Sequence, residues 1–159
     1  MLRNMTTIYI RNYNKFLMLY RIGSRVVSDS WCGIGGHFEN DELNDPKSCV
    51  LRELFEEVGI KEYQLQNIEL KYVTLRLKNE EMRQNYYFFA DIVDSEVDIS
   101  NCDEGKLQWV HRDVLTSLEM PFTAKACLEH YASIGQFTNE KYAGIATLEG
   151  VNFIELKEF

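Results

Sequence analysis

Several signals that would narrow the function of this sequence are missing. Its four cysteines form no CxxC pair, so their spacing gives no indication of a structural zinc site. No apolar run reaches the length of a signal peptide or of a transmembrane helix. Internal repeats and low-complexity tracts are absent as well. We therefore expect a cytoplasmic protein with reduced thiols and no membrane partner.

Positive charge is also scarce. The chain has 17 lysines and arginines against 25 aspartates and glutamates, which gives a formal net charge of −8 and a pI of about 4.9. A nucleic-acid polymer requires a basic face, so this balance excludes such a polymer as the expected ligand. It does not exclude a nucleotide whose charge reaches the protein through Mg²⁺.

What is present is typical of one globular α/β domain. With 159 residues, 45% of them hydrophobic, the chain is long enough for one core, and we expect a single domain over residues 1–159. Helical spacing and capping residues predict helices at 46–58, 112–117 and 121–135. Runs of strand-forming residues predict strands at 5–11, 15–21, 31–36, 65–77, 84–93 and 107–111, with a closing hairpin at 143–148 and 152–156. The expected fold is a mixed sheet with helices on both faces.

The most informative stretch contains the first of these helices. Asp45 is a suitable N-cap and Pro46 suits the first helical position, while Gly59 suits the left-handed conformation that ends many helices. At 100° per residue, the apolar side chains fall on one side of the helix. Glu53, Glu56 and Glu57 fall on the other side at spacing i, i+3 and i+4. These glutamates alone are more typical of a solvated acidic face than of a metal site.

Two further features favour a metal site over a solvated face. Like charges at this spacing repel each other, and a divalent cation such as Mg²⁺, which prefers oxygen ligands, reverses that effect. The Gly35-Gly36 pair lies upstream, where a bare backbone approaches a ligand closely and offers a carbonyl oxygen.

This stretch resembles the signature of the Nudix hydrolase family. That signature is Gly, five residues, Glu, seven residues, Arg-Glu, an aliphatic residue, any residue, Glu-Glu, any residue, Gly and an aliphatic residue. Residues 52–60, Arg-Glu-Leu-Phe-Glu-Glu-Val-Gly-Ile, match its second half, and Gly36 and Glu42 match its first half. Nine residues, not seven, separate Glu42 from Arg52. Because the cap lies at Asp45, we expect the loop before the helix to hold the two extra residues.

The resemblance covers about residues 5–135 and implies an α/β/α sandwich, to which the C-terminal hairpin is an addition. It implies Mg²⁺-dependent hydrolysis of a nucleoside diphosphate linked to another moiety, with Mn²⁺ as a substitute. It implies metal ligands at Glu56, Glu57 and the Gly36 carbonyl, and Glu53 as a ligand or as the base that orients water. Arg52, Glu42 and Gly59 are implied to be structural.

Other residues fit the implied site less specifically. Glu104 in a loop and Glu39 after the glycines match metal ligands of some members, and Glu104 also matches a base. Arg21 and Arg25 are expected either to meet phosphate or to be solvated loop charges. Phe122, in the segment 120–123, is available to stack on a base.

The substrate stays open at this point. The resemblance to hydrolases of oxidised purine triphosphates makes oxidised dGTP (8-oxo-dGTP), cleaved to the monophosphate and pyrophosphate, the leading expectation. Cys32 after Trp31 and the absence of an acid in segment 120–123 depart from those enzymes, because a thiol lacks the paired donor and acceptor of an amide. Unmodified nucleoside triphosphates, ADP-ribose and nucleotide sugars are the alternatives.

Two further hypotheses assign the chain a function other than catalysis. A nucleotide-sensing Nudix module without catalysis is one, although Glu53, Glu56 and Glu57 are all retained. A pure interaction domain with an incidental acidic helix is the other. The expected partner is a small-molecule nucleotide, and the expected assembly is a monomer or homodimer.

Overall fold

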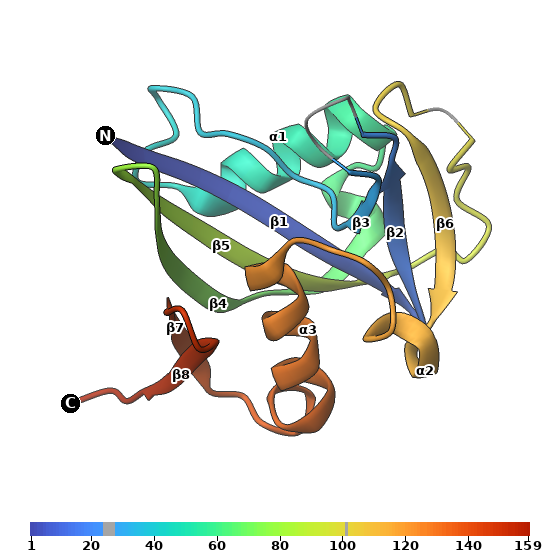
Figure 1. Ribbon diagram of the computed structural model, residues 1–159. Coiled ribbons are helices and arrows are strands. Elements are labelled where there is room, and N and C mark those ends of the chain that lie inside the picture. Colours follow the sequence, from blue (N-terminus) through green and yellow to red (C-terminus); the bar gives the residue numbers. More distant parts are fainter. Residues whose placement is uncertain (24–27, 101) are drawn as a thin grey trace.

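The computed structural model describes residues 1–23, 28–100 and 102–159 and shows an eight-stranded mixed sheet with helices on both faces (Figure 1). The expected α/β fold class is therefore confirmed. The elements are, in chain order, β1 (Leu2–Asn12), β2 (Lys15–Arg21), β3 (Ser30–Cys32), α1 (Pro46–Val58), β4 (Leu65–Lys78), β5 (Glu81–Ile92), β6 (Lys106–His111), α2 (Arg112–Leu115), α3 (Phe122–Ser133), β7 (Lys141–Ala146) and β8 (Val151–Leu156).

The strands follow the order β3-β2-β1-β5-β4-β7-β8, and β6 pairs with β2. β1 runs parallel to β5 and β7 runs parallel to β4, while the other pairs are antiparallel. β2 is covered along one edge by β6, and its other edge is shared between β1 and β3. The long pairing of β1 with β5 forms the centre of the sheet.

Two apolar cores lie on the two faces of this sheet. Alternate side chains of each central strand point to opposite faces, so neighbours such as Ile8 and Tyr9 belong to different cores. Val50, Leu54 and Val58 of α1 pack in the core that contains Ile8. The core that contains Tyr9 is closed by residues of α3 such as Leu128. The central strands are thus buried on both faces, as their continuous apolar runs predict.

The turns between the strands are tighter than the sequence predicted. β4 and β5 are joined by Asn79 and Glu80 alone, with φ of 51° and 61°, and β5 begins at Glu81, which the prediction had placed in the turn. A two-residue turn with positive φ at both positions matches the twist of antiparallel strands. Asn12 likewise ends β1, so the turn to β2 consists of Tyr13 and Asn14.

The strand predicted over residues 31–36 is shorter than expected. Regular pairing covers only Ser30–Cys32, after which the chain touches β1 through isolated bridges of Ile34 with Ile8 and of His37 with Met5. Gly33 and Gly35 interrupt the strand, and the chain there lies directly against β1. A Cβ on Gly35 would lie 2.1 Å from the carbonyl oxygen of Thr6, so only glycine permits this approach.

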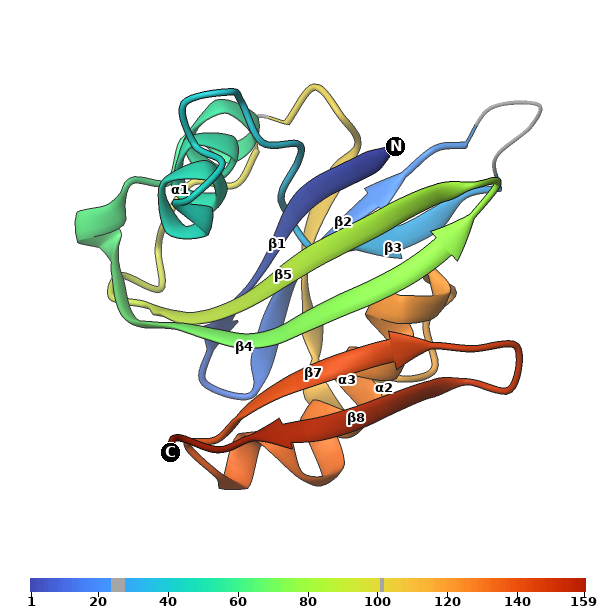
Figure 2. The same ribbon diagram turned by 90° about the vertical axis from the view of Figure 1, so that its left-hand side faces the viewer.

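The C-terminal hairpin extends the main sheet (Figure 2). β7 pairs in parallel with β4 and β8 forms the edge, so the predicted hairpin exists and lies beside β4. The helix predicted at 121–135 and the strand predicted from 143 differ in their bounds, since α3 ends at Ser133, a 3-10 turn covers Gly135–Phe137 and β7 already begins at Lys141. The helices of the described part of the chain are all too short or too polar to cross a membrane.

Candidate active site

Helix α1 carries the glutamates, and both of its ends are fixed. The Asp45 carboxylate accepts hydrogen bonds from the Ser48 backbone N–H at 3.0 Å and from the Ser48 hydroxyl at 2.7 Å. Gly59 adopts the left-handed conformation with φ 80°, and its N–H donates to the Phe55 carbonyl at 2.8 Å. Since Val50, Leu54 and Val58 anchor the apolar face, the glutamates on the opposite face have fixed positions.

Arg52 ties the loop before α1 to the helix. Its guanidinium donates to both carboxylate oxygens of Glu42, at 2.7 and 2.9 Å, and to the His37 carbonyl at 3.0 Å. Glu42 is only 8% exposed, and it also accepts the Glu39 backbone N–H at 3.0 Å. Chiefly because of the Arg52 hydrogen bonds, the pKa of Glu42 is lowered to about 2. The loop thus contains the two extra residues, and Glu42 and Arg52 still pair.

Arg52 also holds two of the three glutamates of the helix. Its Nη1 donates to Glu53 at 2.9 Å and to Glu56 at 3.0 Å. The Glu53 side chain is 15% exposed, whereas that of Glu56 is 55% exposed and lies at the outer side of the helix. We call Arg52, Glu42, Glu53 and Glu56 the Arg52 cluster. In it, a bidentate ion pair fixes side chains that would otherwise repel each other.

Arg21, at the end of β2, forms a second cluster with the third glutamate. Its Nη2 lies 2.6 Å from Glu104 and 3.3 Å from Glu57. Burial raises the pKa of Glu57 to about 7, and the neighbouring Glu104 and Glu53 carboxylates add to this rise, while Arg21 opposes it. Glu57 Oε2 and Arg21 Nε are buried and have no hydrogen-bond partner within the described structure. We call Arg21, Glu57 and Glu104 the Arg21 cluster.

The glycine loop lies against these carboxylates. A Cβ on Gly36 would lie 2.4 Å from the Glu53 carboxylate, so a larger residue would displace that side chain. The Gly36 carbonyl, expected as a metal ligand, accepts the Thr6 backbone N–H at 2.8 Å. One of its two lone pairs is thus engaged with β1.

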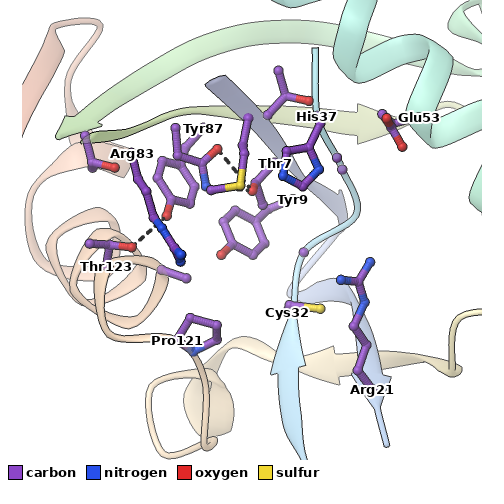
Figure 3. A pocket seen from close by; sticks show the side chains of 18 of the residues that line it. Thr7, Tyr9, Arg21, Cys32, His37, Glu53, Arg83, Tyr87, Pro121 and Thr123 are labelled. Atoms are coloured by element: carbon purple, nitrogen blue, oxygen red, sulfur yellow. Dashed lines mark hydrogen bonds between the residues drawn. The ribbon is translucent and has the colours of Figure 1, made fainter. Parts of the chain in front are cut away.

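A cavity of about 560 Å³ connects the glutamates with the face of the sheet that α3 covers. One end is lined by Glu53, Glu57, Glu104 and Arg21, and the other by Arg76, Arg83, Asn85 and Thr123. Figure 3 shows Glu53 and Arg21 on one side of this cavity and Arg83 and Thr123 on the other. Such a volume and mixed lining are typical of a small-molecule site.

Some predicted site residues lie away from this cavity. Glu39 is exposed and does not line it, because its backbone is used in the turn that orients Glu42. Phe122, expected to stack on a base, lies under the Arg76 guanidinium at 5.7 Å from its ring centroid and lines a different hollow with His130. Its neighbours Pro121 and Thr123 line the cavity in its place. Arg25 lies outside the described residues.

Sequence reasoning missed the far end of the cavity. Arg76 and Arg83 are cross-strand partners, and Thr74 pairs with Asn85 two residues further from the turn. The signal was available in the hairpin register. Counting back equally from the two-residue turn at Asn79 and Glu80 pairs these positions and places them on one face.

Cys32, which the sequence analysis singled out, does line the cavity. Burial raises the pKa of its thiol to about 11, so it is neutral at physiological pH. Its Sγ lies 3.5 Å from the Leu19 carbonyl oxygen.

The carboxylates supply oxygen donors of the kind that Mg²⁺ and Mn²⁺ prefer. Within the described residues, however, no three His, Cys, Asp or Glu side chains stand arranged as a finished metal site. The reason is visible in the contacts: Arg52 holds Glu53 and Glu56, and Arg21 holds Glu57 and Glu104. The unpartnered Glu57 Oε2 is an acceptor that fits a cation.

Comparison with known proteins agrees with this geometry. Solved structures of similar fold include the mutator MutT protein from Bacillus halodurans, with a TM-score of 0.65 and 20% identity over 96% of this chain and 97% of that one. They include the ORF135 protein of E. coli, with a TM-score of 0.66 and 18% identity over 84% of this chain and 90% of that one. They also include the MutT protein from Methanosarcina mazei Go1, with a TM-score of 0.65 and 24% identity over 83% of this chain and 94% of that one.

At these identities the structural likeness shows the fold, and a sequence comparison shows the family. The family model of the NUDIX domain matches residues 1–131, which is most of the chain. The chain therefore belongs to the Nudix family, whose hydrolases act on pyrophosphate bonds and generally use a divalent metal ion.

Proposed function

We propose that this chain is a Mg²⁺-dependent hydrolase that cleaves a nucleoside diphosphate linked to another moiety, with Mn²⁺ as a possible substitute ion. The observation that carries the proposal is the Arg21 cluster. Glu57 lines a cavity together with Glu53, Glu104 and a guanidinium, and its Oε2 is buried without a hydrogen-bond partner among the described residues. A buried carboxylate oxygen without a hydrogen-bond partner is costly in a folded protein, and a cation bound there removes that cost.

The residues that would hold the metal are Glu57 and Glu56, with Glu53, Glu104 and the Gly36 carbonyl as further ligands. Glu39 was also predicted as a metal ligand, and it is exposed and does not line the cavity. A divalent ion in this position supplies Lewis-acid stabilisation of the negative charge that develops on phosphoryl oxygens. The donors fit this ion because they are all oxygen atoms, and because a glycine at position 36 lets the Glu53 carboxylate lie directly against the backbone of the loop.

The chain's own residues contribute orientation and charge. Arg52 fixes the rotamers of Glu53 and Glu56 through its two hydrogen bonds, and Glu42 in turn holds Arg52. Arg21 has a buried Nε–H without a partner, which supports a role in donating to a phosphate oxygen. Glu53 or Glu104 is the proposed base that orients the attacking water.

The substrate has two candidate classes. Hydrolysis of an oxidised purine triphosphate such as 8-oxo-dGTP, to the monophosphate and pyrophosphate, is supported by the family resemblance and by fold neighbours named MutT. ADP-ribose or a nucleotide sugar is the alternative. It is favoured by the neutral Cys32 thiol, and by Pro121 and Thr123, which bring no acid to read a base edge. A nucleotide-sensing module stays the non-catalytic alternative.

Incubation with Mg²⁺, followed by chromatography of the nucleotide products, tests the proposal for every compound, because ADP-ribose and nucleotide sugars are cleaved to phosphomonoesters and release neither phosphate nor pyrophosphate. The panel contains oxidised and normal nucleoside triphosphates, ADP-ribose, dinucleoside polyphosphates and nucleotide sugars, each also incubated with Glu57→Gln. We expect turnover of one class and its loss in the variant. Nucleotide binding without turnover of any compound would contradict the enzyme and leave the sensor.

The remaining expectations stay predictions. They are a single domain over residues 1–159, a cytoplasmic location, a monomer or homodimer, and no nucleic-acid partner. Sedimentation velocity, with and without an oligonucleotide, tests the last two directly.

A further inference from the structure

The end of the cavity remote from the glutamates is unusually basic for a chain with a net charge of −8. Arg76 on β4 and Arg83 on β5 are direct cross-strand partners, and both line the cavity. Like charges directly opposite each other on antiparallel strands destabilise the pairing. Two arginines in this register are therefore stabilised by an anion nearby.

The protein itself supplies only part of that compensation. The Glu81 carboxylate lies 2.8 Å from Arg83 Nε and 3.3 Å from Arg3 Nε, so one acid is shared by two arginines. Arg76 has no ion pair in the described part of the chain and stacks on the Phe122 ring. The four charged groups Arg3, Arg76, Arg83 and Glu81 thus leave an excess of positive charge at this end.

The N-terminus of helix α3 lies at the same end of the cavity. Phe122 is the first residue of α3, and Pro121, Thr123 and Ala124 line the cavity. The helix has no side-chain cap and no acid in its first turn, and its first backbone hydrogen bond runs from the Lys125 N–H to the Pro121 carbonyl at 2.9 Å. The amides before Lys125 are therefore available to an anion, as at many phosphate-binding helix ends.

Polar, uncharged side chains also line the cavity. Asn85 donates to the Thr7 hydroxyl at 3.1 Å, and the Tyr87 hydroxyl donates to Thr123 at 3.3 Å. The three acids that line the cavity, Glu53, Glu57 and Glu104, lie at the other end. Figure 3 shows this separation, with Arg83 and Thr123 facing the cavity from the side opposite Glu53. The cavity thus has an acidic end and a basic end.

We propose that the substrate carries a second anionic group, a phosphate or a carboxylate, beyond the diphosphate that is cleaved, and that Arg76, Arg83 and the first turn of α3 bind it. The inference rests on the proposed function and narrows its substrate class. Two guanidinium groups and free helix amides can donate several hydrogen bonds to one anion. An uncharged sugar or base would add little binding free energy at these groups.

Matched pairs of compounds test this directly, because the members of each pair differ by one distal anion. ADP-ribose against ADP-ribose 2′-phosphate tests a phosphate, and UDP-glucose against UDP-glucuronate tests a carboxylate. We expect a kcat/KM about tenfold or more higher for the anionic member of at least one pair, as is usual for charge-assisted hydrogen bonds. The pair that responds identifies the anion.

The variants separate a binding site from general electrostatics. Arg76→Gln combined with Arg83→Gln should reduce the preference to within about twofold. Lys78→Gln combined with Lys141→Gln is the matched control, because this variant also loses two positive charges and neither exposed lysine lines the cavity. It should keep the preference. Thermal unfolding of both variants tests whether they remain folded, because the arginine double variant loses the Arg83–Glu81 ion pair and the Arg76 contact with Phe122 together with the like-charge repulsion.

A measurement without turnover keeps this inference separate from the reaction. Calorimetry compares adenosine 2′,5′-bisphosphate with AMP, and we expect the bisphosphate to bind more tightly in the parent protein and not in the double variant. If no compound is hydrolysed but this difference is found, the proposed function fails and the anion site stands.

Three results would overturn the anion site. The first is equal handling of both members of every pair, in turnover and in binding. The second is a preference that survives in the double variant. The third is a preference for guanine over adenine nucleotides that the double variant loses, because the arginines would then read the acceptor edge of a purine.

Discussion

Two arginine–glutamate clusters on α1 use the same residue types in opposite electrostatic states. In the Arg52 cluster, the Glu42 carboxylate is fully paired and its pKa is lowered to about 2. In the Arg21 cluster, Glu57 is buried with one free oxygen and its pKa is raised to about 7. We infer that a satisfied ion pair belongs to the scaffold and that an unsatisfied one lies where a ligand binds.

The geometry explains why the two clusters differ. The Arg52 guanidinium uses all of its nitrogen atoms to bind carboxylates on the helix and in the loop. Each of these carboxylates therefore has a positively charged partner. Arg21 comes from the end of β2 and reaches Glu57 and Glu104 with a single nitrogen. A stability effect is therefore expected from the Arg52–Glu42 pair and an activity effect from the Arg21 cluster.

The largest effect should come from Glu57→Gln, which removes the free oxygen's charge and keeps the shape of the side chain. We expect kcat to fall by about 10²- to 10³-fold, as for the loss of one preorganised charge in an active site. The free energy of unfolding should not fall, because a costly buried carboxyl is replaced by a neutral amide. Steady-state kinetics with urea denaturation shows whether activity and stability separate in this way. Equal losses of both would erase the distinction between the clusters.

Arg52→Gln should show the opposite pattern. It leaves the nearly buried Glu42 without its partner, so we expect the free energy of unfolding to fall by about 3 kcal/mol. Double substitution of Arg52 and Glu42 by Gln should recover part of this loss, since the unpaired charge is gone. Urea denaturation of the single and double variants measures both quantities. A stability unchanged in Arg52→Gln would contradict a structural role.

The next effect concerns the glycine loop between the clusters. Gly36→Ala meets only the flexible end of Glu53, so we expect about a tenfold loss in kcat with little loss of stability. Gly35→Ala meets the backbone of Thr6 and requires a positive φ, so it should lower the melting temperature instead. Kinetics and thermal unfolding of the two neighbours provide a matched comparison. The same outcome for both would mean that the loop acts as one unit.

The smallest effect should come from the helix cap. Asp45→Ala removes the hydrogen bonds to Ser48, and we expect a loss of about 1 kcal/mol in the free energy of unfolding. Because α1 stays anchored by its apolar face, kcat should change less than it does in Gly36→Ala. Denaturation and kinetics on one preparation decide this, and a loss of activity larger than the loss in Gly36→Ala would make the cap part of the site.

Much of this could be predicted from the sequence because it is encoded locally. The cap at Asp45, the stop at Gly59 and the 100° spacing of Glu53, Glu56 and Glu57 fix the helix and its acidic face. The family resemblance added the glycine loop and the role of Arg52. The two extra residues before the helix left the pairing with Glu42 intact, because the loop absorbs them.

What could not be predicted depends on contacts between distant segments. Nothing local shows that Arg52 takes Glu53 and Glu56 while Arg21 takes Glu57, since Arg21 is more than thirty residues away. The inward direction of Thr123 and the outward direction of Phe122 depend on how α3 sits on the sheet. The far end of the cavity required the exact register of β4 and β5, which becomes visible only when the turn is known to have two residues.

The measurement that tests the central claim most directly is a carbon-13 NMR titration of the glutamate carboxyls in the metal-free protein. Glu42→Gln and Glu57→Gln would assign the two resonances. We predict that Glu57 titrates near pH 7 and that Glu42 stays ionised far below the ordinary glutamate value, towards pH 2.

The two shifts also have opposite consequences for stability. The stabilisation from Glu42 is present above its unfolded pKa and is lost as the pH falls towards 2, whereas that from protonated Glu57 is lost as the pH rises through 7. If both carboxyls titrated together near the ordinary value of about 4.3, the two clusters would be electrostatically equivalent and the account would be contradicted.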